Sequence, residues 1–507
     1  MLRMGFFPKE LPPTFTTAGF ADFVNIHNGC FLKAKTRARI ARPLSFSLAK
    51  SGHSRRILKI FNPFNQYELV QVIADGWGEI EKHLEDGRLS KSRPMTDPNG
   101  RRALVTKNNG NDLPLIRAEI RSVARHLLKA DIARFYHTIY THSIPWALHG
   151  KEWSKKNRDG GLGNDIDRIL RNGQDQQTLG IPVGPDTSLV IAEIIATAVD
   201  LRLGATPSFR FIDDYEFAVP NSAAADSVLV ELENALGEFE LALNPLKTTT
   251  AALPQPLDRD WVISIRGYEI DDGEVDRKTL VKYFNHVFDL ARNRPFDAVI
   301  AYAVGRLRTV EVAEDVWPDF QNLLFQCAMA DPASLPTVVG QLYRHAKFGV
   351  SPRLRDVVNE LVAYHAPLGH ASETLWAIWA AIWFKCDLSA TAAEAILKID
   401  DPLVWVAALD CRSRGLISFP DLSVLDSRVD SSELLDRNWI LAYEAPLRGW
   451  YGDKTGIYRD RDFGPLATAD VSFYDPNPKT PVAFLIDLSG YGYIVAAADD
   501  PGENLDF

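Results

Sequence analysis

Three aspartates sit where the sequence predicts sharp turns of the chain. Asp213 and Asp214 are adjacent within Arg210-Phe-Ile-Asp-Asp-Tyr-Glu-Phe217, where the apolar residues on both sides indicate two short strands. The acid pair is therefore predicted at the tight turn of a hairpin. Asp131 comes at the end of another predicted strand. If the two strands are neighbours, the three carboxylates converge on one edge of a sheet.

Clustered carboxylates of this kind suit divalent cations. Mg²⁺ prefers oxygen ligands and is usually held by one or two carboxylates together with substrate phosphates. Two such ions can activate a 3′-hydroxyl and stabilise the leaving pyrophosphate during in-line displacement. A single aspartate at a turn is more often a plain turn former, so the chemical interpretation depends on the whole combination.

Helices and strands alternate around the aspartates. Apolar residues recur at helical spacing over 66–86, and a second helix is predicted over 114–128, directly before Asp131. The other predicted elements are a helix after Asp131, a loop over 180–188, a buried helix over 189–203, the hairpin, an amphipathic helix over 223–241 and a segment over 243–249. This order predicts an α+β unit.

The character of the sequence changes at about residue 276. One helix follows another with short breaks, which is typical of stacked helix pairs. The helices are predicted at 278–293, 297–305, 335–346, 353–364, 371–384, 390–398 and 402–414, and strands at 470–475 and 482–487. We therefore expect a first domain over 1–275, with an N-terminal arm over 1–50, and a helical domain over 276–507.

Charge is distributed unevenly along the 507 residues. The net charge of −10 divides into +11 for residues 1–150, −9 for 151–300 and −12 for 301–507. Basic runs such as 33–39 and the series Arg117, Arg121 and Arg125 favour a polyanionic ligand on the N-terminal part. A solvated surface is the alternative.

Composition excludes several classes of protein. There is no uninterrupted apolar run of membrane-spanning length and no N-terminal secretory signal. The four cysteines are scattered without a CxxC pair, which argues against a zinc ribbon or a disulfide framework and fits a reducing cytoplasm. We expect a cytoplasmic protein that does not contact a membrane.

Four segments resemble the conserved motifs of reverse transcriptases in their order and spacing. They are Asp131-Ile-Ala-Arg-Phe-Tyr136 for motif A, Gly180-Ile-Pro-Val-Gly-Pro-Asp-Thr-Ser188 for motif B, Phe211-Ile-Asp-Asp214 for motif C and Asn244-Pro-Leu-Lys-Thr248 for motif D. Residues 139–151 and Glu10-Leu-Pro-Pro resemble the bacterial abortive-infection and defence-associated branch. The resemblance implies an α+β fold, with a reverse-transcriptase fingers–palm module followed by an all-α, HEAT-like helical C-terminal domain.

The resemblance also implies roles for individual residues. Asp131, Asp213 and Asp214 would hold two Mg²⁺ ions, or Mn²⁺, with Ile132 in the same metal-binding set. Lys247 would donate a proton to pyrophosphate. The implied substrate-binding residues are Tyr136 as the steric gate against a ribose 2′-OH, Phe135 and Ile132 through backbone amides, Arg102 as a triphosphate clamp with Arg101 as its rival, and Gly184 and Val183 in motif B.

Two positions depart from the family pattern. Val183 stands where many reverse transcriptases have glutamine, and Phe211 replaces the usual tyrosine of motif C. Loss of a polar contact at Val183 weakens the expectation that a template–dNTP pair is gripped, but it does not affect the metal ligands.

Three functions stay open at this point. The first is a dNTP polymerase of antiphage defence that primes on protein, uses no template and leaves single-stranded DNA covalently attached. The second is a reverse transcriptase that copies a dedicated non-coding RNA, and the third is a non-catalytic nucleic-acid scaffold or sensor. The family implies a homo-oligomer. Tyr451, Tyr458 and Tyr474 are candidate priming residues among the 15 tyrosines.

Several aromatic residues have simpler interpretations. His142 and His149 are expected to be packed or capping residues rather than catalytic bases. Trp376, Trp379 and Trp383 recur at helical spacing and are expected to pack between helices rather than to stack on bases. The same expectation holds for the helical face of Trp439, Tyr443 and Leu447.

Overall fold

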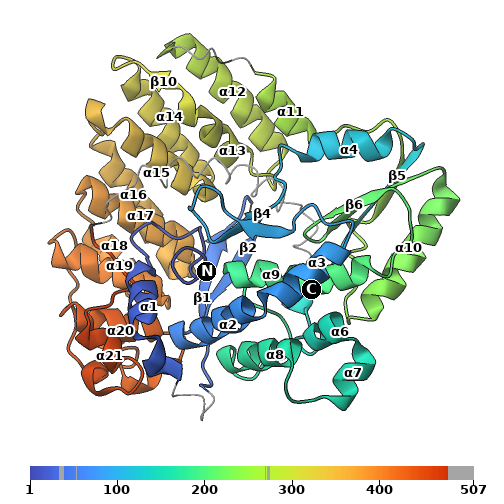
Figure 1. Cartoon of the computed structure of the whole chain (residues 1–507). Helices are drawn as coiled ribbons and strands as arrows, with labels where there is room; N and C mark the ends of the chain where they lie inside the picture. The colour runs from blue at the N-terminus through green and yellow to red at the C-terminus, as the bar shows by residue number, and fades with distance from the viewer. Residues whose placement is uncertain (33–38, 53, 269, 271–273, 478–507) are drawn as a thin grey trace.

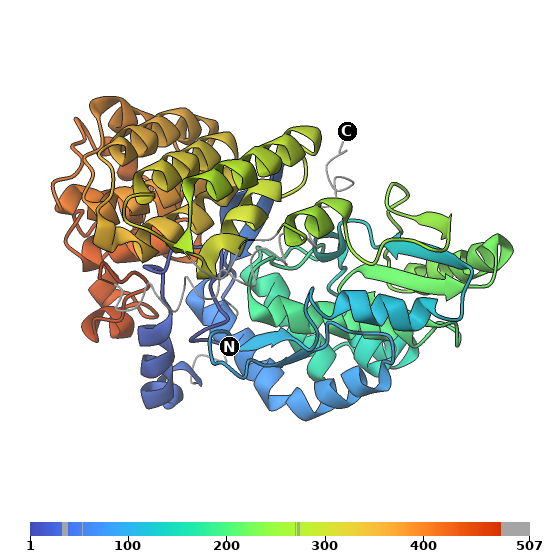
Figure 2. The ribbon, with the colours of Figure 1, turned by 90° about the horizontal axis from the view of Figure 1, so that it is seen from above.

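The computed structural model describes residues 1–32, 39–52, 54–268, 270 and 274–477 (Figure 1). It is a mixed α+β structure, as predicted. We call residues 63–252, which surround the largest sheet, the sheet lobe. Residues 260–468, which are mainly helical, are the helical lobe. Figure 2 shows the two lobes side by side.

The sheet of the sheet lobe has four antiparallel strands in the order β6-β7-β5-β8. The strands are β5 (His126–Asp131), β6 (Ser208–Phe211), β7 (Asp214–Val219) and β8 (Thr249–Ala252). The register of β5 and β7 pairs Asp131 with Asp214 and Lys129 with Glu216. Because side chains alternate between the two faces of a strand, these four polar residues share one face. The residues between them, such as Tyr215, are buried in the core.

Nine helices of the described chain surround this sheet. They are α2 (Pro63–Asp75), α3 (Trp77–Asp86), α4 (Leu113–Arg121), α5 (Phe135–Thr138), α6 (Ser143–His149), α7 (Lys151–Lys156), α8 (Leu162–Gly173), α9 (Asp186–Asp200) and α10 (Ser222–Gly237). The helix predicted over 66–86 is divided at Gly76, which ends α2 and precedes α3.

The helix predicted over 114–128 is wrong at its C-terminal end. Helix α4 stops at Arg121, and His126–Asp131 instead forms a central strand that pairs with both β7 and β8. Pairing with two neighbouring strands outweighs the local helical pattern. The predicted hairpin and the predicted strand end at Asp131 are confirmed.

Helices of the helical lobe stack in two rows. Helices α12, α14, α16 and α18 contact one another in succession, as do α13, α15, α17 and α19. The bounds are α11 (Asp260–Arg266), α12 (Arg277–Asn293), α13 (Val299–Arg306), α14 (Trp317–Ala330), α15 (Leu335–Arg344), α16 (Arg353–His365), α17 (Ala371–Phe384), α18 (Ala390–Ile396), α19 (Pro402–Ser413), α20 (Trp439–Leu447) and α21 (Gly464–Thr468). All seven helices predicted here from the sequence are present, whereas α11, α14 and α21 correspond to no predicted helix.

The last part of the chain differs from its prediction. The stretch 470–475 forms no extended strand, because only Tyr474 makes a bridge, to Phe15 of the N-terminal arm. The strand predicted at 482–487 lies outside the described residues.

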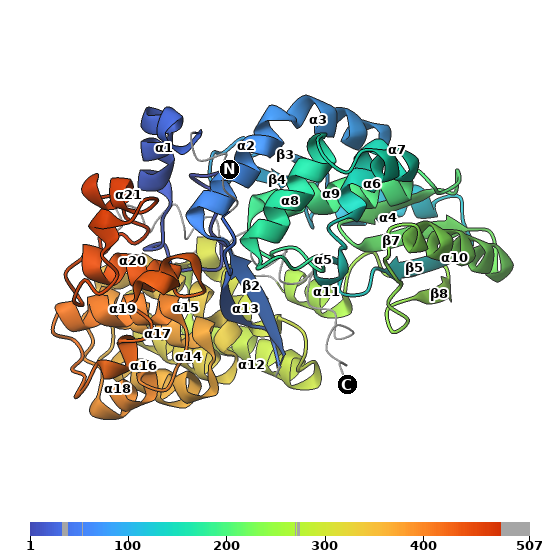
Figure 3. The same cartoon turned by 90° about the horizontal axis from the view of Figure 1, so that it is seen from below.

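The N-terminal segment joins the two lobes. Its elements are α1 (Ala18–Leu32), β1 (Leu44–Ala49) and β2 (Arg55–Ile60), and the β1–β2 hairpin lies between the lobes in Figure 3. The short strands β3 (Pro94–Thr96), β4 (Leu104–Thr106), β9 (Glu274–Val275) and β10 (Glu311–Val312) form two further pairs.

Buried side chains form two clusters that divide the chain in an unexpected way. One cluster combines residues 6–67 with residues 261–474, and the other contains residues 61–241. Phe20 of α1, for example, packs on Phe473, with ring centroids 5.5 Å apart. The N-terminal arm therefore shares its core with the helical lobe. None of the helices in the described part of the chain is long and apolar enough to cross a membrane.

Candidate active site

Asp131 and Asp214 face each other across the central strand pair of the sheet. They are register partners, and each carboxyl group lies close enough to the other to influence its pKa. Asp213 occupies the adjoining turn, and its carbonyl oxygen accepts a hydrogen bond from the N–H of Ile132 at 3.2 Å. The register therefore brings the three predicted carboxylate residues to one edge of the sheet.

Electrostatic repulsion acts at this edge. Desolvation raises the pKa of the Asp214 carboxyl well above its usual range, and the charges of Asp213 and Asp131 raise it further. Asp214 is nevertheless exposed, so solvent weakens these effects. Desolvation also raises the pKa of Asp131, against the opposing effects of Lys247 and Asn244. Such a site gains stability when a cation replaces the shared proton.

The donor set suits a hard cation. Asp131 and Asp214, as register partners, supply two carboxylates on one face of the sheet, and two carboxylates are enough protein ligation for one Mg²⁺ that also binds substrate phosphates. In the described part of the chain, the donor atoms of the three aspartates do not all lie within 4.8 Å of one another. The three carboxylates therefore do not form a closed three-ligand site.

Lys247 is held against Asp131 by a tight turn. The N–H groups of Lys247 and Thr248 donate to the carbonyl oxygen of Asn244, and the N–H of Asn244 donates to the carbonyl oxygen of Asp131 at 2.8 Å. This turn places Lys247 Nζ 3.4 Å from Asp131 Oδ2. The structure thus brings the predicted proton donor to the predicted metal-binding residues.

The hairpin turn has an unusual backbone. Ile212 has a φ of +59°, a left-handed conformation that a β-branched residue rarely adopts. Its N–H donates to Ser92 Oγ at 2.7 Å, and its carbonyl oxygen accepts from Arg210 Nη1 at 2.9 Å. These two bonds from outside the turn hold the strained residue that precedes Asp213.

A buried ionic cluster, which the sequence did not predict, lies between the hairpin and α9 and supports the turn. The Arg210 guanidinium is fully buried and contacts Glu193 at 2.9 Å and Asp200 at 2.9 Å, both on α9. Tyr215 Oη donates to Asp200, and Ser90 and Ser92 donate to Glu193. Two features of the sequence could have indicated this cluster. Acidic residues lie inside the apolar helix predicted over 189–203, and an arginine directly precedes the acid pair of the hairpin.

Helix α5 places the predicted steric gate beside the aspartates. Tyr136 is half-buried, and desolvation followed by the charge of Asp213 raises the pKa of its hydroxyl. The Phe135 ring is buried and meets the Tyr136 ring edge to face, with centroids 5.7 Å apart. Tyr136 therefore lies close enough to Asp213 for the carboxylate to oppose ionisation of the tyrosine hydroxyl.

Backbone amides after Asp131 are only partly available to a triphosphate. Ile132 donates its N–H to the carbonyl oxygen of Asp213, and Ala133 donates to Ala242 at 2.9 Å. The implied role of the Ile132 amide in phosphate binding therefore conflicts with its place in the fold. Arg134, in the left-handed conformation, begins the short helix α5.

The loop before α9 connects to α5 at its start and to the N-terminal arm at its end. The N–H of Ile181 donates to the carbonyl oxygen of Tyr136 at 2.8 Å. Val183 is half-buried, and its carbonyl oxygen accepts from the N–H of Lys59 on β2. Gly184 has a φ of +126° and lies against Pro8 so closely that an added Cβ would be 2.7 Å from Pro8 Cγ.

The guanidinium of Arg102 is already engaged. It contacts the carboxylate of Asp186, at the start of α9, and the carbonyl oxygen of Phe7. A role as a triphosphate clamp would require Arg102 to leave these partners. Arg101 is exposed beside it.

Basic residues on α4 are also engaged. Arg117 and Arg121 each contact Glu216 of β7 at 2.6 Å. The charge pattern of the sequence favours a polyanionic ligand at these two arginines. In the structure they instead attach α4 to the sheet.

The two histidines have different surroundings. His142 Nδ1 lies 2.9 Å from Asp167 Oδ2, and its side chain makes no cap bond to α6. His149 Nε2 accepts the N–H of Gly163 at 3.1 Å, and its ring packs on Trp153.

The aromatic faces of the helical lobe are core residues, as predicted. Trp376 and Trp379 are buried in contact with each other, and Trp383 packs beside Trp379. Trp439 and Tyr443 are fully buried.

The three candidate priming tyrosines differ in accessibility. Tyr474 is fully buried and donates to Asp410 at 2.8 Å, so it cannot present its hydroxyl to the sheet lobe in this conformation. Tyr451 is half-buried against Asp426, and Tyr458 is exposed. All three lie in the helical lobe or directly after it.

No protein-family model matches the chain, and no curated protein sequence matches it.

Proposed function

We propose that this chain is a DNA polymerase of the reverse-transcriptase fold that joins deoxynucleotides in antiphage defence. In this proposal residues 1–275 contain the fingers and palm, and residues 276–507 form the HEAT-like helical domain. The two rows of stacked helices support the second part of that description. The functional conclusion depends on the sheet lobe.

One observation carries the proposal: Asp131 and Asp214 are paired across β5 and β7, with Asp213 in the adjoining turn. A structural role alone does not explain like charges brought together at a sheet edge, because their repulsion destabilises the fold without a cation. A site for Mg²⁺, with Mn²⁺ as a substitute, explains the arrangement.

Each residue has a definite part in the proposed reaction. Asp131, Asp213 and Asp214, with the carbonyl oxygen of Ile132, would hold the metal ions. When bound, these ions supply Lewis acidity at the attacking hydroxyl and at the phosphates. Lys247, whose Nζ lies 3.4 Å from Asp131 Oδ2, would give a proton to the departing pyrophosphate.

In this proposal the residues after Asp131 select the nucleotide substrate. The Tyr136 ring beside Asp213 would exclude a ribose 2′-OH, so that dNTPs are preferred to rNTPs. The backbone amide of Phe135, at the start of α5, would contact the triphosphate, because those of Ile132 and Ala133 are hydrogen-bonded within the fold.

We favour synthesis without a template. Pro8 of the N-terminal arm is in contact with Gly184, which leaves less room for a template strand at the motif B glycine. Val183 has no polar side chain with which to grip a template–dNTP pair. The DNA product would be single-stranded and attached to the protein. A second candidate, copying of a non-coding RNA, uses the same aspartates and is distinguished by experiment.

The test is an incorporation assay. Wild type and an Asp213→Ala/Asp214→Ala variant are incubated with labelled dNTPs and Mg²⁺, with and without prior RNase treatment. We expect label on the wild-type protein only, unaffected by RNase and released from the protein fraction by protease. Circular dichroism and gel filtration check that the variant is folded and show the size of the expected homo-oligomer.

The other outcomes assign the alternatives. Label that disappears after RNase treatment means that an RNA is copied. Absence of label in both conditions, combined with equal phage protection by wild type and variant in cells, means that the chain is a nucleic-acid scaffold or sensor without chemistry.

A further inference from the structure

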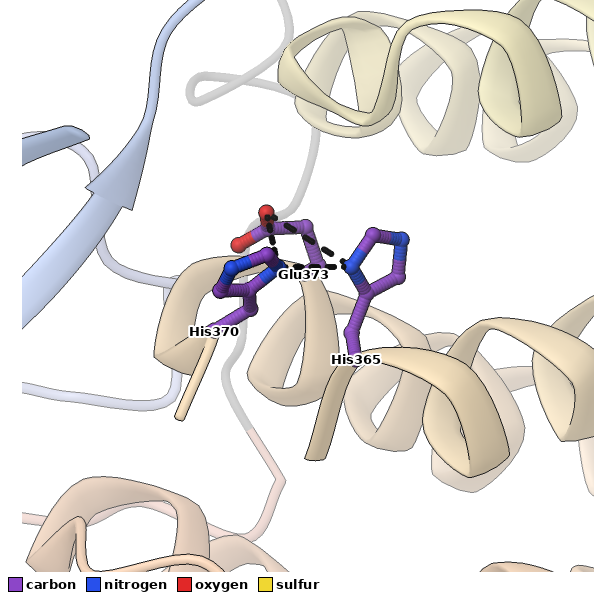
Figure 4. Close-up of side chains that lie close together, drawn as sticks. All are labelled: His365, His370 and Glu373. Carbon is purple, nitrogen blue, oxygen red and sulfur yellow. Dashed lines mark hydrogen bonds and ion pairs between the residues drawn. The ribbon is translucent and has the colours of Figure 1, made fainter. Parts of the chain in front are cut away.

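Two histidines and a glutamate gather at the corner between α16 and α17, far along the chain from the aspartates. His365 Nδ1 lies 3.0 Å from His370 Nδ1. Glu373 Oε1 lies 3.8 Å from His365 Nδ1 and 3.6 Å from His370 Nδ1. Figure 4 shows the three side chains pointing toward one another. Among the residues that the structure describes, no other group of three or more metal-ligating side chains gathers its donor atoms within 4.8 Å.

The cluster is built by one short stretch of chain. His365 is the last residue of α16, a single 3₁₀ turn over Ala366–Leu368 follows, and His370 precedes the first residue of α17. Gly369 makes the reversal possible with a φ of +71°. Glu373 stands in the first turn of α17. The pattern His-x4-His-x2-Glu therefore fixes the three side chains locally.

The separations match those of a bound transition metal. Zinc binds imidazole nitrogen and carboxylate oxygen at about 2.0–2.2 Å in tetrahedral geometry, which separates neighbouring ligand atoms by about 3.3 Å. The three separations in the cluster lie on both sides of that value. His365 and Glu373 are buried, and His370 is half-buried and leaves a side open to solvent.

We propose that His365, His370 and Glu373 form a zinc site that fastens α16 to α17. The chemistry of the donors selects the metal, because two imidazoles and one carboxylate suit Zn²⁺ better than the harder Mg²⁺. Three protein ligands leave a fourth position for water.

A second observation links this corner to the β1–β2 hairpin, which lies between the two lobes. The Arg55 guanidinium, on β2, contacts both oxygens of Glu373, with Nη2 2.8 Å from Oε2. Ser372 Oγ donates to the same Oε2 at 2.7 Å. These contacts orient the carboxylate as outer partners of a metal ligand do. The zinc would share Glu373 with Arg55, on the hairpin whose Lys59 contacts the loop before α9.

The experiment measures zinc directly in the full-length protein. Wild type, His365→Ala and His370→Ala are stripped with a chelator, titrated with Zn²⁺ by calorimetry, dialysed and analysed for metal content. We expect about one zinc per wild-type chain and a loss of affinity of at least about 100-fold in each histidine variant, since removal of even an outer partner costs about 10–100-fold. Substitution with Co²⁺ should give visible absorption bands that the variants lack.

Two controls separate this site from others. His286→Ala alters a half-buried histidine of α12 whose Nε2 lies 2.9 Å from Ser264 Oγ, and it should leave zinc binding unchanged. Asp213→Ala/Asp214→Ala removes the sheet-lobe carboxylates and should also retain the zinc. Zinc binding at this cluster is therefore tested independently of polymerase activity.

A simple hydrogen bond between the two imidazoles is the competing explanation. It predicts that wild type holds no more zinc than His370→Ala, and that Co²⁺ gives no bands. Either result, or zinc that disappears with the two aspartates, would overturn the proposal. Circular dichroism of His370→Ala, whose side chain is partly exposed, shows whether that variant is folded.

Discussion

Lys247 Nζ lies 3.4 Å from Asp131 Oδ2, and both side chains are almost completely buried. The two residues are 116 positions apart and meet because the turn at Asn244 is hydrogen-bonded to the end of β5. The lysine thus brings one positive charge to an edge that carries three carboxylates. Among the contacts described above, the Lys247 ammonium group is the positive charge nearest to the three carboxylates.

Replacement of Lys247 tests its chemical role. If its ammonium group donates a proton to pyrophosphate, Lys247→Gln lowers the rate of nucleotide incorporation by about 100-fold or more. Incorporation rates of the variant and of wild type check this effect.

A matched control uses an exposed lysine. Lys282→Gln, on α12, removes the same charge from the surface of the helical lobe and should leave the rate unchanged. If Lys247→Gln retains the wild-type rate, Lys247 serves only as a counter-charge for Asp131.

The carboxylate edge should make stability depend on pH in the absence of metal. The pKa of Asp214 is raised in the folded state by desolvation and by Asp213 and Asp131, so the folded protein keeps a proton that the unfolded chain has already lost. The stability gained from that proton is complete below the unfolded pKa, near 4, and is lost as pH rises through the folded value. Thermal unfolding with chelator should therefore shift to lower temperature as pH rises.

Asp214→Asn and added Mg²⁺ should each reduce this pH dependence. The amide removes one of the crowded charges and should raise the free energy of unfolding at pH 8 by about 1 kcal/mol, a modest value because solvent screens the partly exposed side chain. If the unfolding temperature of metal-free wild type does not fall between about pH 4 and pH 8, the aspartates do not interact strongly.

Arg210 provides a test of the support behind the hairpin. Arg210→Met leaves Glu193 and Asp200 buried without a counter-charge, which should lower the free energy of unfolding by about 3–5 kcal/mol. Chemical denaturation measures this loss. The control is Arg202→Met, because Arg202 and Glu238 form an exposed pair 2.8 Å apart whose removal should cost less than about 1 kcal/mol. Equal losses in the two variants would contradict the proposed support.

The sequence predicted the parts of the site that depend on local patterns. The apolar residues around Asp213 indicate the hairpin because strand alternation is a property of neighbouring residues. The end of the strand at Asp131 is likewise predicted, but residues 126–128 of the strand fall within the helix predicted over 114–128, since the two partners of the strand lie at 214–219 and 249–252. Pairing across such separations leaves no local signal.

Contacts between distant segments account for the rest. Arg210 was singled out only as the start of the hairpin, because its partners are fixed by the way α9 packs on the sheet. The position of Pro8 against Gly184 has no periodic or motif signal in either segment. Engagement of Arg102 by Asp186 also follows from this packing, since the residues flank the N-terminal arm.

Gly184 and Pro8 can be tested as a pair. Gly184→Ala adds a Cβ that would lie 2.7 Å from Pro8 Cγ at a φ of +126°, so it should both strain the loop and displace the arm. We expect a loss of about 2–4 kcal/mol in the free energy of unfolding. Gly150→Ala is the control for strain alone, because its φ is +87° and nothing lies within 4 Å of an added Cβ.

A double-mutant cycle with Pro8→Gly isolates the contact. If the arm rests on Gly184, Pro8→Gly relieves part of the clash, and the combined variant should be more stable than the sum of the single effects by about 0.5–3 kcal/mol. Limited proteolysis of Gly184→Ala should also release the first residues of the chain faster than in Gly150→Ala. Strict additivity together with unchanged proteolysis would mean that the arm does not cover the loop in solution, and the preference for template-free synthesis would lose its structural support.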